Sequence, residues 1–336
     1  MKRISYIVAT RNKLPYLRVL LDRFSEQLAE DEELIVVDGD SSDGTIDYVA
    51  ELTGGNASIR FIPGPDHCQA HGYNKGILSA EGRYLKLLTD DDVYYLPVLR
   101  RCADFLDEHP EVDVLCANTI DVREREGEVV YDSRPTENSF HEWSSGGAAF
   151  WFGDQGLLIR RSSLPMVGLL DTGVCCIDVE FSVRLTTLRQ VRLAWYSGVG
   201  ACSVINAASL SVSDRFAEAN AEEVARIFRY YGQIARLREA MKNPDRQAAE
   251  TVERQINLDH GPLRRFLRPR TRLLGLSKFV KRFGARGSEK VTAETVPVIQ
   301  PVEHSRDAGK ARSLEDWMER YNREHGGKFF LGNGEN

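Results

Sequence analysis

Apolar runs of strand length alternate with amphipathic stretches through the first 120 residues of the chain. Residues 4–9 (ISYIVA) form the first such run, and apolar side chains then recur at helical spacing between residues 14 and 28. Strands separated by helices of about ten residues predict βαβ units and a mostly parallel sheet with helices on both faces. The predicted strands cover 4–9, 33–38, 58–62, 84–88 and 112–118, and the predicted helices cover 14–28, 46–52, 73–80 and 97–108.

After residue 120 the regular alternation of predicted strands and helices ends. Residues 157–160 have the composition of a short strand, and residues 178–187 have that of a helix. A long helical pattern covers residues 214–242, whereas residues 290–336 are polar, with a short helix expected at 314–321 and a loose, Gly-rich end. These shifts divide the chain into an α/β domain (1–212), a helical and basic extension (213–288) and a polar tail with a short helix (289–336).

Polar residues directly follow three of the predicted strands. They are the segments Thr10-Arg11-Asn12, Asp38-Gly39-Asp40-Ser41 and Thr89-Asp90-Asp91-Asp92. Open parallel sheets bind their ligands beyond the carboxyl ends of the strands. We therefore expect the chemistry of this protein to lie where these three segments meet.

Composition narrows the class of protein. The 336 residues are 42% hydrophobic and carry a formal charge of −6, so the chain can bury a core and lacks the basic excess of a general nucleic-acid binder. No apolar run approaches the roughly 18 residues of a spanning helix, and the short run near Met1 does not have the pattern of a secretion signal. We expect a cytoplasmic protein whose six cysteines, with no C-x-x-C pair, are reduced and mostly buried.

The acidic segment Asp90-Asp91-Asp92 is the strongest chemical signal. Three adjacent carboxylates at the end of an apolar strand repel one another unless a cation neutralises them. Carboxylate oxygens suit Mg²⁺ or Mn²⁺, and Mg²⁺ is commonly held by one or two carboxylates together with substrate phosphates. The alternative is that Asp91 or Asp92 caps the helix that follows.

Two further segments are compatible with binding a nucleotide. Asp38 directly ends its strand and can accept a hydrogen bond from a nucleobase or a ribose, whereas Asp43 and Thr45 fit a turn and a helix cap. Asn74 and Lys75 belong to a predicted helix start that could face a phosphate, although Lys75 is equally compatible with a solvated surface position.

In order and spacing, the motifs in residues 1–118 resemble those of the inverting family 2 glycosyltransferases, which have the GT-A fold. The resemblance implies a nucleotide-sugar-binding half (1–118) and an acceptor-binding half (119–212), with Mn²⁺ or Mg²⁺ as cofactor. The matching motifs are Ala9-Thr10-Arg11-Asn12, Val36 to Thr45, Asn74-Lys75-Gly76 through Leu85, and Asp90 to Asp92.

The resemblance also implies the roles of individual residues. Asp178, in Ile177-Asp178-Val179-Glu180, takes the position of the catalytic base, with Glu180 as the fallback, although Asp178 also fits a helix N-cap. Metal ligation falls to Asp91 and Asp92. Contact with the nucleotide sugar falls to Thr10, Arg11, Asn12, Asp38, Asp40, Asn74, Lys75, Asp90 and Asp91.

The sequence departs from the family pattern at three positions. Ile177 replaces a Glu, Gly39 stands where many relatives have a second Asp, and Thr89 stands where many have the first Asp of Asp-x-Asp. The departure at Gly39 leaves open how the nucleobase and the ribose are bound. The departure at Thr89 leaves open whether Asp91 or Asp92 holds the metal, with Asp90 nearer the ribose. The implied reaction is a single displacement, in which a carboxylate deprotonates the acceptor hydroxyl and a divalent ion stabilises the diphosphate leaving group.

An aromatic and polar cluster precedes the strand at 157–160. Aromatic faces bind the apolar faces of sugars, and polar neighbours fix their hydroxyls, so we expect a saccharide or lipid-linked saccharide acceptor here. An ordinary packed core is the alternative. The expected acceptor-binding residues are Trp151, Asp154, Gln155 and Glu180.

Residues 262–287 interleave cations with apolar side chains, and residues 261–287 contain nine Arg or Lys and no acid. Such a segment can lie on an anionic membrane surface, which would make the protein peripheral on the inner face of the membrane. A solvated helical face remains the alternative, and nucleic-acid binding is disfavoured because no recognised nucleic-acid-binding fold accompanies the segment.

Two other functions fit parts of the pattern. A degenerate domain that binds a nucleotide without transferring sugar would have lost the metal-binding acids or the base, and both are present in this sequence. A sugar nucleotidyltransferase would carry a Gly-rich loop after the first strand, and Thr10-Arg11-Asn12-Lys13 is not Gly-rich.

Overall fold

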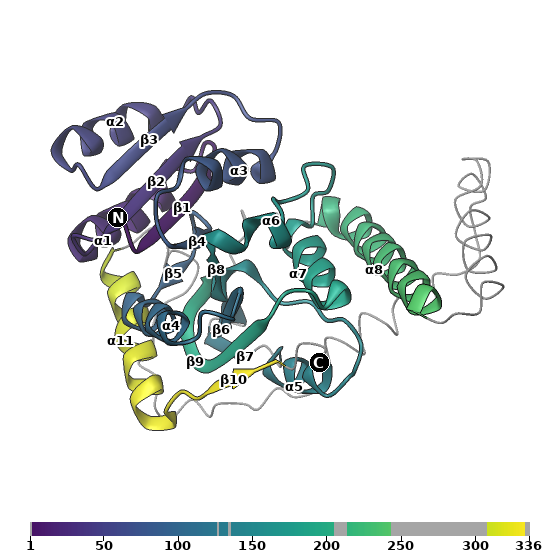
Figure 1. The fold of residues 1–336 in the computed structure, drawn as a ribbon. Coiled ribbons are helices and arrows are strands. Elements are labelled where there is room, and N and C mark those ends of the chain that lie inside the picture. Colours follow the sequence, from purple (N-terminus) through teal and green to yellow (C-terminus); the bar gives the residue numbers. More distant parts are fainter. Residues whose placement is uncertain (1, 126–127, 134–135, 205–213, 243–307, 333–336) are drawn as a thin grey trace.

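The computed structural model describes residues 2–125, 128–133, 136–204, 214–242 and 308–332. The basic segment 262–287 lies outside the described residues. Figure 1 shows a central sheet flanked by helices, with the long helix α8 running away from the body of the molecule beside α7.

The sheet contains ten strands in the order β10-β9-β6-β8-β4-β1-β2-β3, with β5 paired to β9 and β7 paired to β6. Neighbouring strands β1–β2, β1–β4, β2–β3 and β6–β9 are parallel, whereas β8 and β10 run antiparallel to their neighbours. The expected α/β architecture is confirmed, but the sheet is mixed rather than mostly parallel, because four strand pairings are parallel and five are antiparallel. The strands are β1 (Ile4–Thr10), β2 (Glu32–Asp38), β3 (Ile59–Pro63), β4 (Tyr84–Leu88), β5 (Val93–Tyr94), β6 (Val114–Arg125), β7 (Glu128–Ser133), β8 (Leu157–Arg160), β9 (Leu193–Val204) and β10 (Phe329–Leu331).

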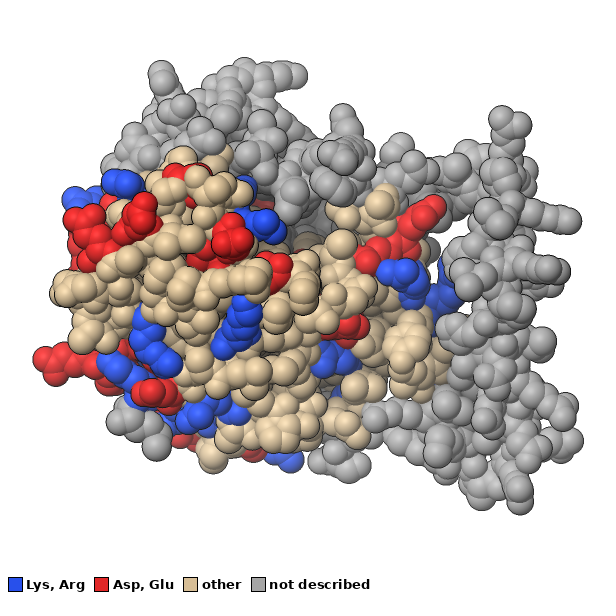
Figure 2. Space-filling model, turned by 90° about the horizontal axis from the view of Figure 1, so that it is seen from above, with Lys and Arg blue, Asp and Glu red and all other residues tan. Residues whose placement is uncertain are grey.

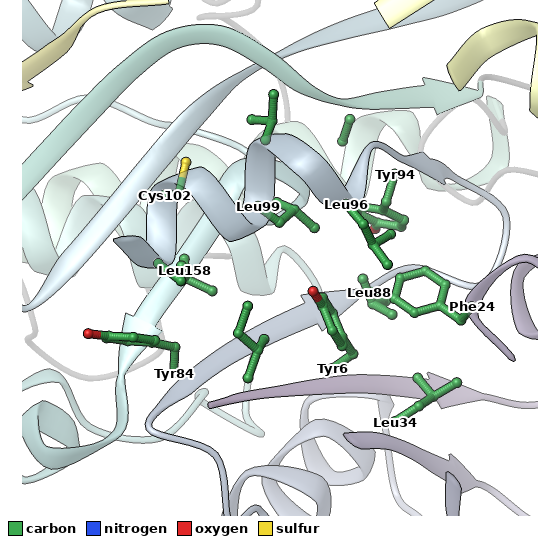
Figure 3. Packing of buried hydrophobic residues seen from close by; sticks show 14 of the residues in the cluster. Tyr6, Phe24, Leu34, Tyr84, Leu88, Tyr94, Leu96, Leu99, Cys102 and Leu158 are labelled. Carbon is green, nitrogen blue, oxygen red and sulfur yellow. The ribbon is translucent and has the colours of Figure 1, made fainter. Parts of the chain in front are cut away.

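Alternate residues along each central strand face opposite layers of helices. Tyr6 and Leu34 pack with Phe24 and Leu99 on the side of α1 and α4, as Figure 3 shows. Ile7, the next residue along β1, packs on the opposite side, against α3 and α7. The helices are α1 (Leu14–Gln27), α2 (Thr45–Gly55), α3 (Gln69–Ser79), α4 (Leu96–Glu108), α5 (Thr136–Ser144), α6 (Leu164–Val167), α7 (Ile177–Leu188), α8 (Asp214–Lys242) and α11 (Ala308–His325), with 3-10 turns η1 (Asp154–Gly156) and η2 (Arg161–Ser163).

A glycine allows α3 to lie directly on β1. A Cβ atom at Gly76 would lie 2.3 Å from Cγ2 of Ile7, so no larger residue fits without moving the helix. This close packing fixes the position of the helix whose first turn lies next to the ends of β1 and β2.

The C-terminal tail differs from the loose segment expected from the sequence. Phe329–Leu331 form β10, which extends the sheet by pairing antiparallel with β9. Leu314, Trp317 and Met318 of α11 are buried, and Glu315 accepts hydrogen bonds from Arg23 of α1. Residues 308–332 therefore pack on the α/β body as part of the fold.

The described residues contain no helix both long and apolar enough to cross a bilayer. Acidic and basic side chains are interspersed on the upper face of the molecule in Figure 2. The described part of this face therefore presents no extended basic surface.

Candidate active site

The ends of three parallel strands meet at one edge of the sheet, as the strand-end residues predict. Thr10 of β1 lies in register with Asp38 of β2, and its carbonyl accepts a hydrogen bond from the backbone N–H of Gly39. The Thr10 hydroxyl donates to Oδ2 of Asp90, just beyond β4, at 2.8 Å. Residues 80 positions apart in the chain are thus brought into contact by the strand order.

Asp38 has a buried oxygen that lacks a partner. Its side chain is fully buried, and Oδ1 accepts a hydrogen bond from the backbone N–H of Ser41 at 2.8 Å. Oδ2 is also buried, and no donor in the described part of the chain reaches it. An unsatisfied buried acceptor costs about 1–3 kcal/mol, and more when it is charged. The site therefore suits a ligand that brings an N–H or O–H group to Asp38.

Asn12 joins the loops that follow β1 and β2. Its side-chain Oδ1 accepts from the backbone N–H of Ser42 at 2.8 Å, and its own N–H donates to Oγ of Ser41 at 2.8 Å. Asn12 and Asp40 both have left-handed backbones, with φ of 54° and 70°. Arg11 and Asp40, in the loops that follow β1 and β2, are exposed.

The three acids after β4 occupy different environments. Asp90 bonds Thr10, whereas Asp92 lies in the interior and accepts from the Thr89 hydroxyl and, at 2.9 Å, from the backbone N–H of Val204. Burial, and then the neighbouring charge of Asp91, raise the pKa of Asp90 to about 7 and the pKa of Asp92 to about 8.

Asp91 is the acid that reaches the surface of the site. Its Oδ2 lies 4.0 Å from Nζ of Lys13, and its side chain is 17% exposed. Asp92, by contrast, uses each of its oxygens for a hydrogen bond within the protein. Of the two expected metal ligands, Asp91 is therefore the accessible one. No group of three or more His, Cys, Asp or Glu side chains among the described residues is placed to hold a metal by itself.

A lysine lies fully buried behind the acids. Nζ of Lys86 donates to the carbonyl of Leu87 at 2.7 Å and to the carbonyl of Asp154 at 3.1 Å. Burial lowers its pKa to about 8, although the nearby charge of Asp154 acts in the opposite direction. Lys86 thus ties β4, which carries the acidic segment, to η1, which carries two expected acceptor-binding residues.

Asp178 lies at the first turn of α7 and faces a pocket. Its Oδ2 accepts a hydrogen bond from Nε1 of Trp151 at 2.8 Å, so the expected base and an expected acceptor residue are in contact. The pocket is small, with a cavity volume of about 10 Å³, and is lined by both polar and apolar side chains. They include Asp154, Asp178, Phe152, Leu170, Ile177 and Phe181.

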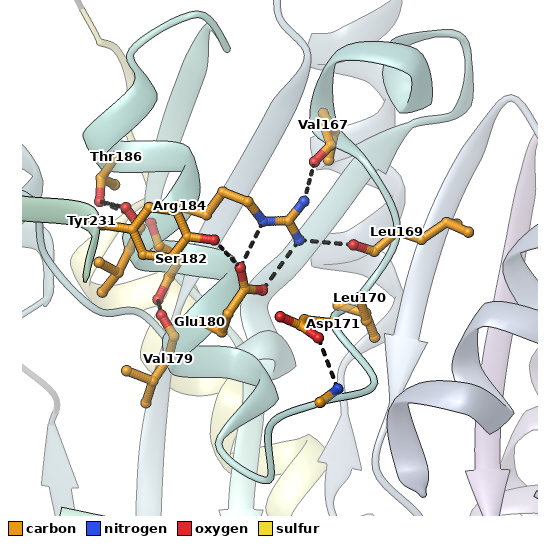
Figure 4. Close-up of polar contacts among 12 residues, drawn as sticks. Val167, Leu169, Leu170, Asp171, Val179, Glu180, Ser182, Arg184, Thr186 and Tyr231 are labelled. Carbon is orange, nitrogen blue, oxygen red and sulfur yellow. Dashed lines mark hydrogen bonds and ion pairs between the residues drawn. The ribbon is translucent and has the colours of Figure 1, made fainter. Parts of the chain in front are cut away.

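Glu180 lies in the interior, away from the place expected for an acceptor-binding residue. It is 3% exposed, accepts a hydrogen bond from the Tyr231 hydroxyl of α8, and forms an ion pair with Nε of Arg184 at 3.0 Å (Figure 4). The same guanidinium donates to the carbonyls of Val167 and Leu169 at 2.9 and 2.8 Å. This network, which the sequence did not reveal, joins α7, α8 and the loop after α6.

A second contact from α8 holds the start of α7. The backbone N–H groups of Cys175 and Cys176 donate to Oε2 of Glu223 at 2.8 and 2.7 Å. Because α7 has no side-chain cap of its own, Glu223 supplies an acceptor at its N-terminus from another helix. Asp178, two residues further on, is therefore positioned partly by α8.

The side chains of Asn74 and Lys75 form hydrogen bonds with the backbone of neighbouring loops. The Asn74 amide exchanges two hydrogen bonds with the backbone of Leu170, at 2.9 and 3.0 Å. Nζ of Lys75 donates to the carbonyls of Gly64 and Pro65 at 3.1 and 2.7 Å. In this arrangement both residues shape the loops around the site.

Comparison with known proteins identifies the family. Residues 5–161 match the model of glycosyl transferase family 2. This segment belongs to glycosyl transferase family 2. The PGL/p-HBAD biosynthesis glycosyltransferases of Mycobacterium bovis and Mycobacterium tuberculosis are 34% identical to the chain over 119 residues, which cover 34% of this chain. The match spans 46% of each of these relatives, less than half of their length.

Solved glycosyltransferase structures share the GT-A-type fold of this chain. The structure of S. aureus TarS 1-349 in complex with UDP-GlcNAc has a TM-score of 0.52 and 19% identity, covering 70% of this chain and 66% of that one. The mannosyltransferase PcManGT from Pyrobaculum calidifontis, in complex with GDP-Man and Mn²⁺, has a TM-score of 0.54 and 18% identity, covering 83% and 80%. At this identity, the likeness establishes the fold alone.

We predict that Lys86 makes stability depend on pH between about 8 and 10. In this window the unfolded chain binds the lysine proton (pKa about 10.4) and the folded chain releases it, so raising the pH favours folding. The free energy of unfolding of the wild type, minus that of Lys86→Met, should therefore rise by up to about 1.4 kcal/mol per pH unit. Urea unfolding at several pH values measures this difference. If the free energies of unfolding of the two proteins change with pH in the same way, the pKa of Lys86 is not lowered by folding.

Proposed function

We propose that this family 2 chain transfers a sugar from a nucleotide-diphospho-sugar to an acceptor hydroxyl, with inversion, during assembly of a polysaccharide or glycolipid. The observation that carries the proposal is the pairing of a strand-end carboxylate site with a second carboxylate, Asp178, in a pocket bordered by β4 and α7. The structural neighbours TarS and PcManGT are complexes with UDP-GlcNAc and GDP-Man, and the mycobacterial relatives are named as biosynthetic glycosyltransferases. These names support the donor class and the biosynthetic role.

In this proposal the donor nucleotide lies across the ends of β1, β2 and β4. Asp38 accepts a hydrogen bond from the base through the oxygen that has no partner among the described residues. Thr10 holds Asp90 in place toward the ribose, and the exposed residues Arg11 and Asp40 lie in the loops that follow β1 and β2.

The residues present fit a divalent cation that is held jointly with the diphosphate. Asp91 provides an accessible hard oxygen ligand, and burial, followed by the charge of Asp91, raises the pKa values of Asp90 and Asp92. Asp91 would therefore hold Mn²⁺ or Mg²⁺, while Asp92 supports the loop from behind. When bound, such an ion stabilises the negative charge of the departing diphosphate.

Asp178 is the proposed general base. A carboxylate in the first turn of α7 can take the proton of the acceptor hydroxyl. The hydroxyl oxygen then attacks the anomeric carbon as the bond to the diphosphate breaks. Trp151 donates to one oxygen of Asp178 and so fixes the orientation of the carboxylate. Glu180 cannot replace it without breaking its bonds to Tyr231 and Arg184.

Asp91→Asn should abolish metal-dependent binding of the nucleotide. The amide keeps the shape of the side chain and removes the charge, so the stabilisation by a nucleoside diphosphate with Mn²⁺ should fall to the level seen with EDTA. Thermal unfolding with each ligand combination measures the loss. Asp47→Asn, an exposed acid on α2, is the matched control and should behave as wild type. Retention of the Mn²⁺-dependent stabilisation in Asp91→Asn would refute the metal role.

Asp178→Asn should lower the transfer rate at least about 100-fold while leaving the affinity for the donor unchanged, since general-base catalysis contributes about 10²–10⁴-fold. Product formation and donor titration measure the two quantities separately. Asp171→Asn, in the exposed loop that leads to α7, is the control. Wild-type turnover in Asp178→Asn would show that another residue is the general base.

We further propose that segment 262–287 holds the enzyme on an anionic membrane, where a lipid-linked acceptor would be found. The nine cations of residues 261–287 motivate this proposal, each contributing about 1 kcal/mol near such a surface. Replacing them with Gln should abolish co-sedimentation with vesicles that contain phosphatidylserine. Neutral phosphatidylcholine vesicles serve as the control. Equal sedimentation of the variant and the wild type with the anionic vesicles would exclude this role.

A further inference from the structure

One face of α8 carries side chains that contact α7 and the residues just before it. Glu223, Ile227 and Tyr231 follow one another at intervals of four residues, so they lie on the same face of the helix. Ile227 and Tyr231 are buried in an apolar cluster that includes Val179 of α7. The Tyr231 hydroxyl donates to Glu180 of the same helix (Figure 4). The apolar and the polar contact together fix this face of α8 against α7.

Glu223 uses both oxygens of its carboxylate. Oε2 accepts hydrogen bonds from the backbone N–H groups of Cys175 and Cys176, at 2.8 and 2.7 Å. Oε1 pairs with the guanidinium of Arg226 at 3.0 Å. The Glu223 side chain is 13% exposed, whereas that of Arg226 is 63% exposed. The largely buried carboxylate is thus directed at the backbone just before α7, and its exposed partner is free to adjust.

The segment held in this way leads directly to Asp178. The loop between α6 and α7 is bound at Leu170 by the side chain of Asn74. Its last residues, Cys175 and Cys176, come just before α7, and Cys176 makes no side-chain cap hydrogen bond of its own. Asp178 is the second residue of the helix. A displacement of the two cysteines would therefore move Asp178 relative to the pocket.

We propose that Glu223 is a positioning residue for the reaction at Asp178, acting as the hydrogen-bond acceptor at the start of α7. This inference rests on the proposed function. The role requires an oxygen that reaches two N–H groups, so the length of the side chain matters more than its charge. Glu223→Gln keeps that length and a carbonyl oxygen, and its NH₂ group would face Arg226, whose exposed side chain can turn away. Glu223→Asp keeps the charge and is shorter by one methylene group.

Hydrolysis of the donor reports on this role without a known acceptor. Water takes the place of the acceptor hydroxyl: its oxygen attacks the anomeric carbon, its proton passes to Asp178, and the bond to the diphosphate breaks. Release of UDP from UDP-GlcNAc, or of GDP from GDP-Man, by the full chain with Mn²⁺ gives kcat and KM. Asp178→Asn should abolish the release, which checks that the assay depends on the base.

Glu223→Ala and Glu223→Asp should lower kcat by about 10- to 100-fold, because a small displacement of a reacting group has an effect of this size. The KM for the donor should not change, since other elements form the site at the ends of β1, β2 and β4. Glu223→Gln should keep most of the wild-type kcat. Hydrogen exchange in peptides covering residues 172–182 should become faster in the Ala and Asp variants, and exchange in α3 should not. Glu222→Ala, at an exposed neighbour on α8, is the matched control and should behave as wild type.

Wild-type kcat in both Glu223→Ala and Glu223→Asp would overturn the inference. A higher kcat in Glu223→Asp than in Glu223→Gln would overturn it as well, because charge would then matter more than reach. Faster exchange throughout the chain together with a lower kcat would assign Glu223 to the stability of the fold alone. If Glu223→Ala does not fold, as thermal unfolding shows, Glu223→Asp carries the test.

The same measurements separate this inference from the proposed function. A wild type that hydrolyses neither nucleotide sugar and binds neither UDP nor GDP would count against the proposed function. Hydrogen exchange at residues 172–182 would then decide by itself whether Glu223 holds the start of α7. Unchanged exchange in Glu223→Ala would overturn the positioning role whatever the reaction.

Discussion

The burial of carboxylates at the ends of parallel strands is the constraint on which this site depends. The strand order places Asp38, Asp90 and Asp92 at one edge of the sheet, where water is largely excluded. The protein satisfies part of their hydrogen-bonding capacity with Thr10, Ser41, Thr89 and Val204. What remains is one unsatisfied oxygen on Asp38 and the partly exposed carboxylate of Asp91, which suit a ligand that brings an N–H group and a cation.

The catalytic half of the site is held by long-range contacts. Glu223 and Tyr231 of α8 reach the start and the interior of α7, and Arg184 connects α7 to the loop at Val167. Because Asn74 binds the backbone of Leu170 in the same loop, the donor-side helix α3 and the base-bearing helix α7 share one connecting segment. Asn74, which the resemblance assigns to nucleotide-sugar binding, thus helps to hold the loop between α6 and α7.

Local patterns predicted the strands that carry the acidic residues, because each is a short apolar run followed by polar residues. They failed for β9, since Gly198 and Gly200 interrupt the strand pattern and its stability comes from pairing with β6. The role of Glu180 could not be predicted from local sequence either, because its partner Tyr231 lies 51 residues further along the chain.

The central claim is that the acidic edge of the sheet holds a cation together with a diphosphate. Anomalous scattering from crystals grown with Mn²⁺ and a nucleoside diphosphate tests it directly. The account predicts a manganese peak bonded to a carboxylate oxygen of Asp91 and to the diphosphate, with Asp92 still bonded to Thr89 behind it. A nucleotide bound at this edge with no manganese at Asp91, or manganese bound only elsewhere on the molecule, would contradict the account.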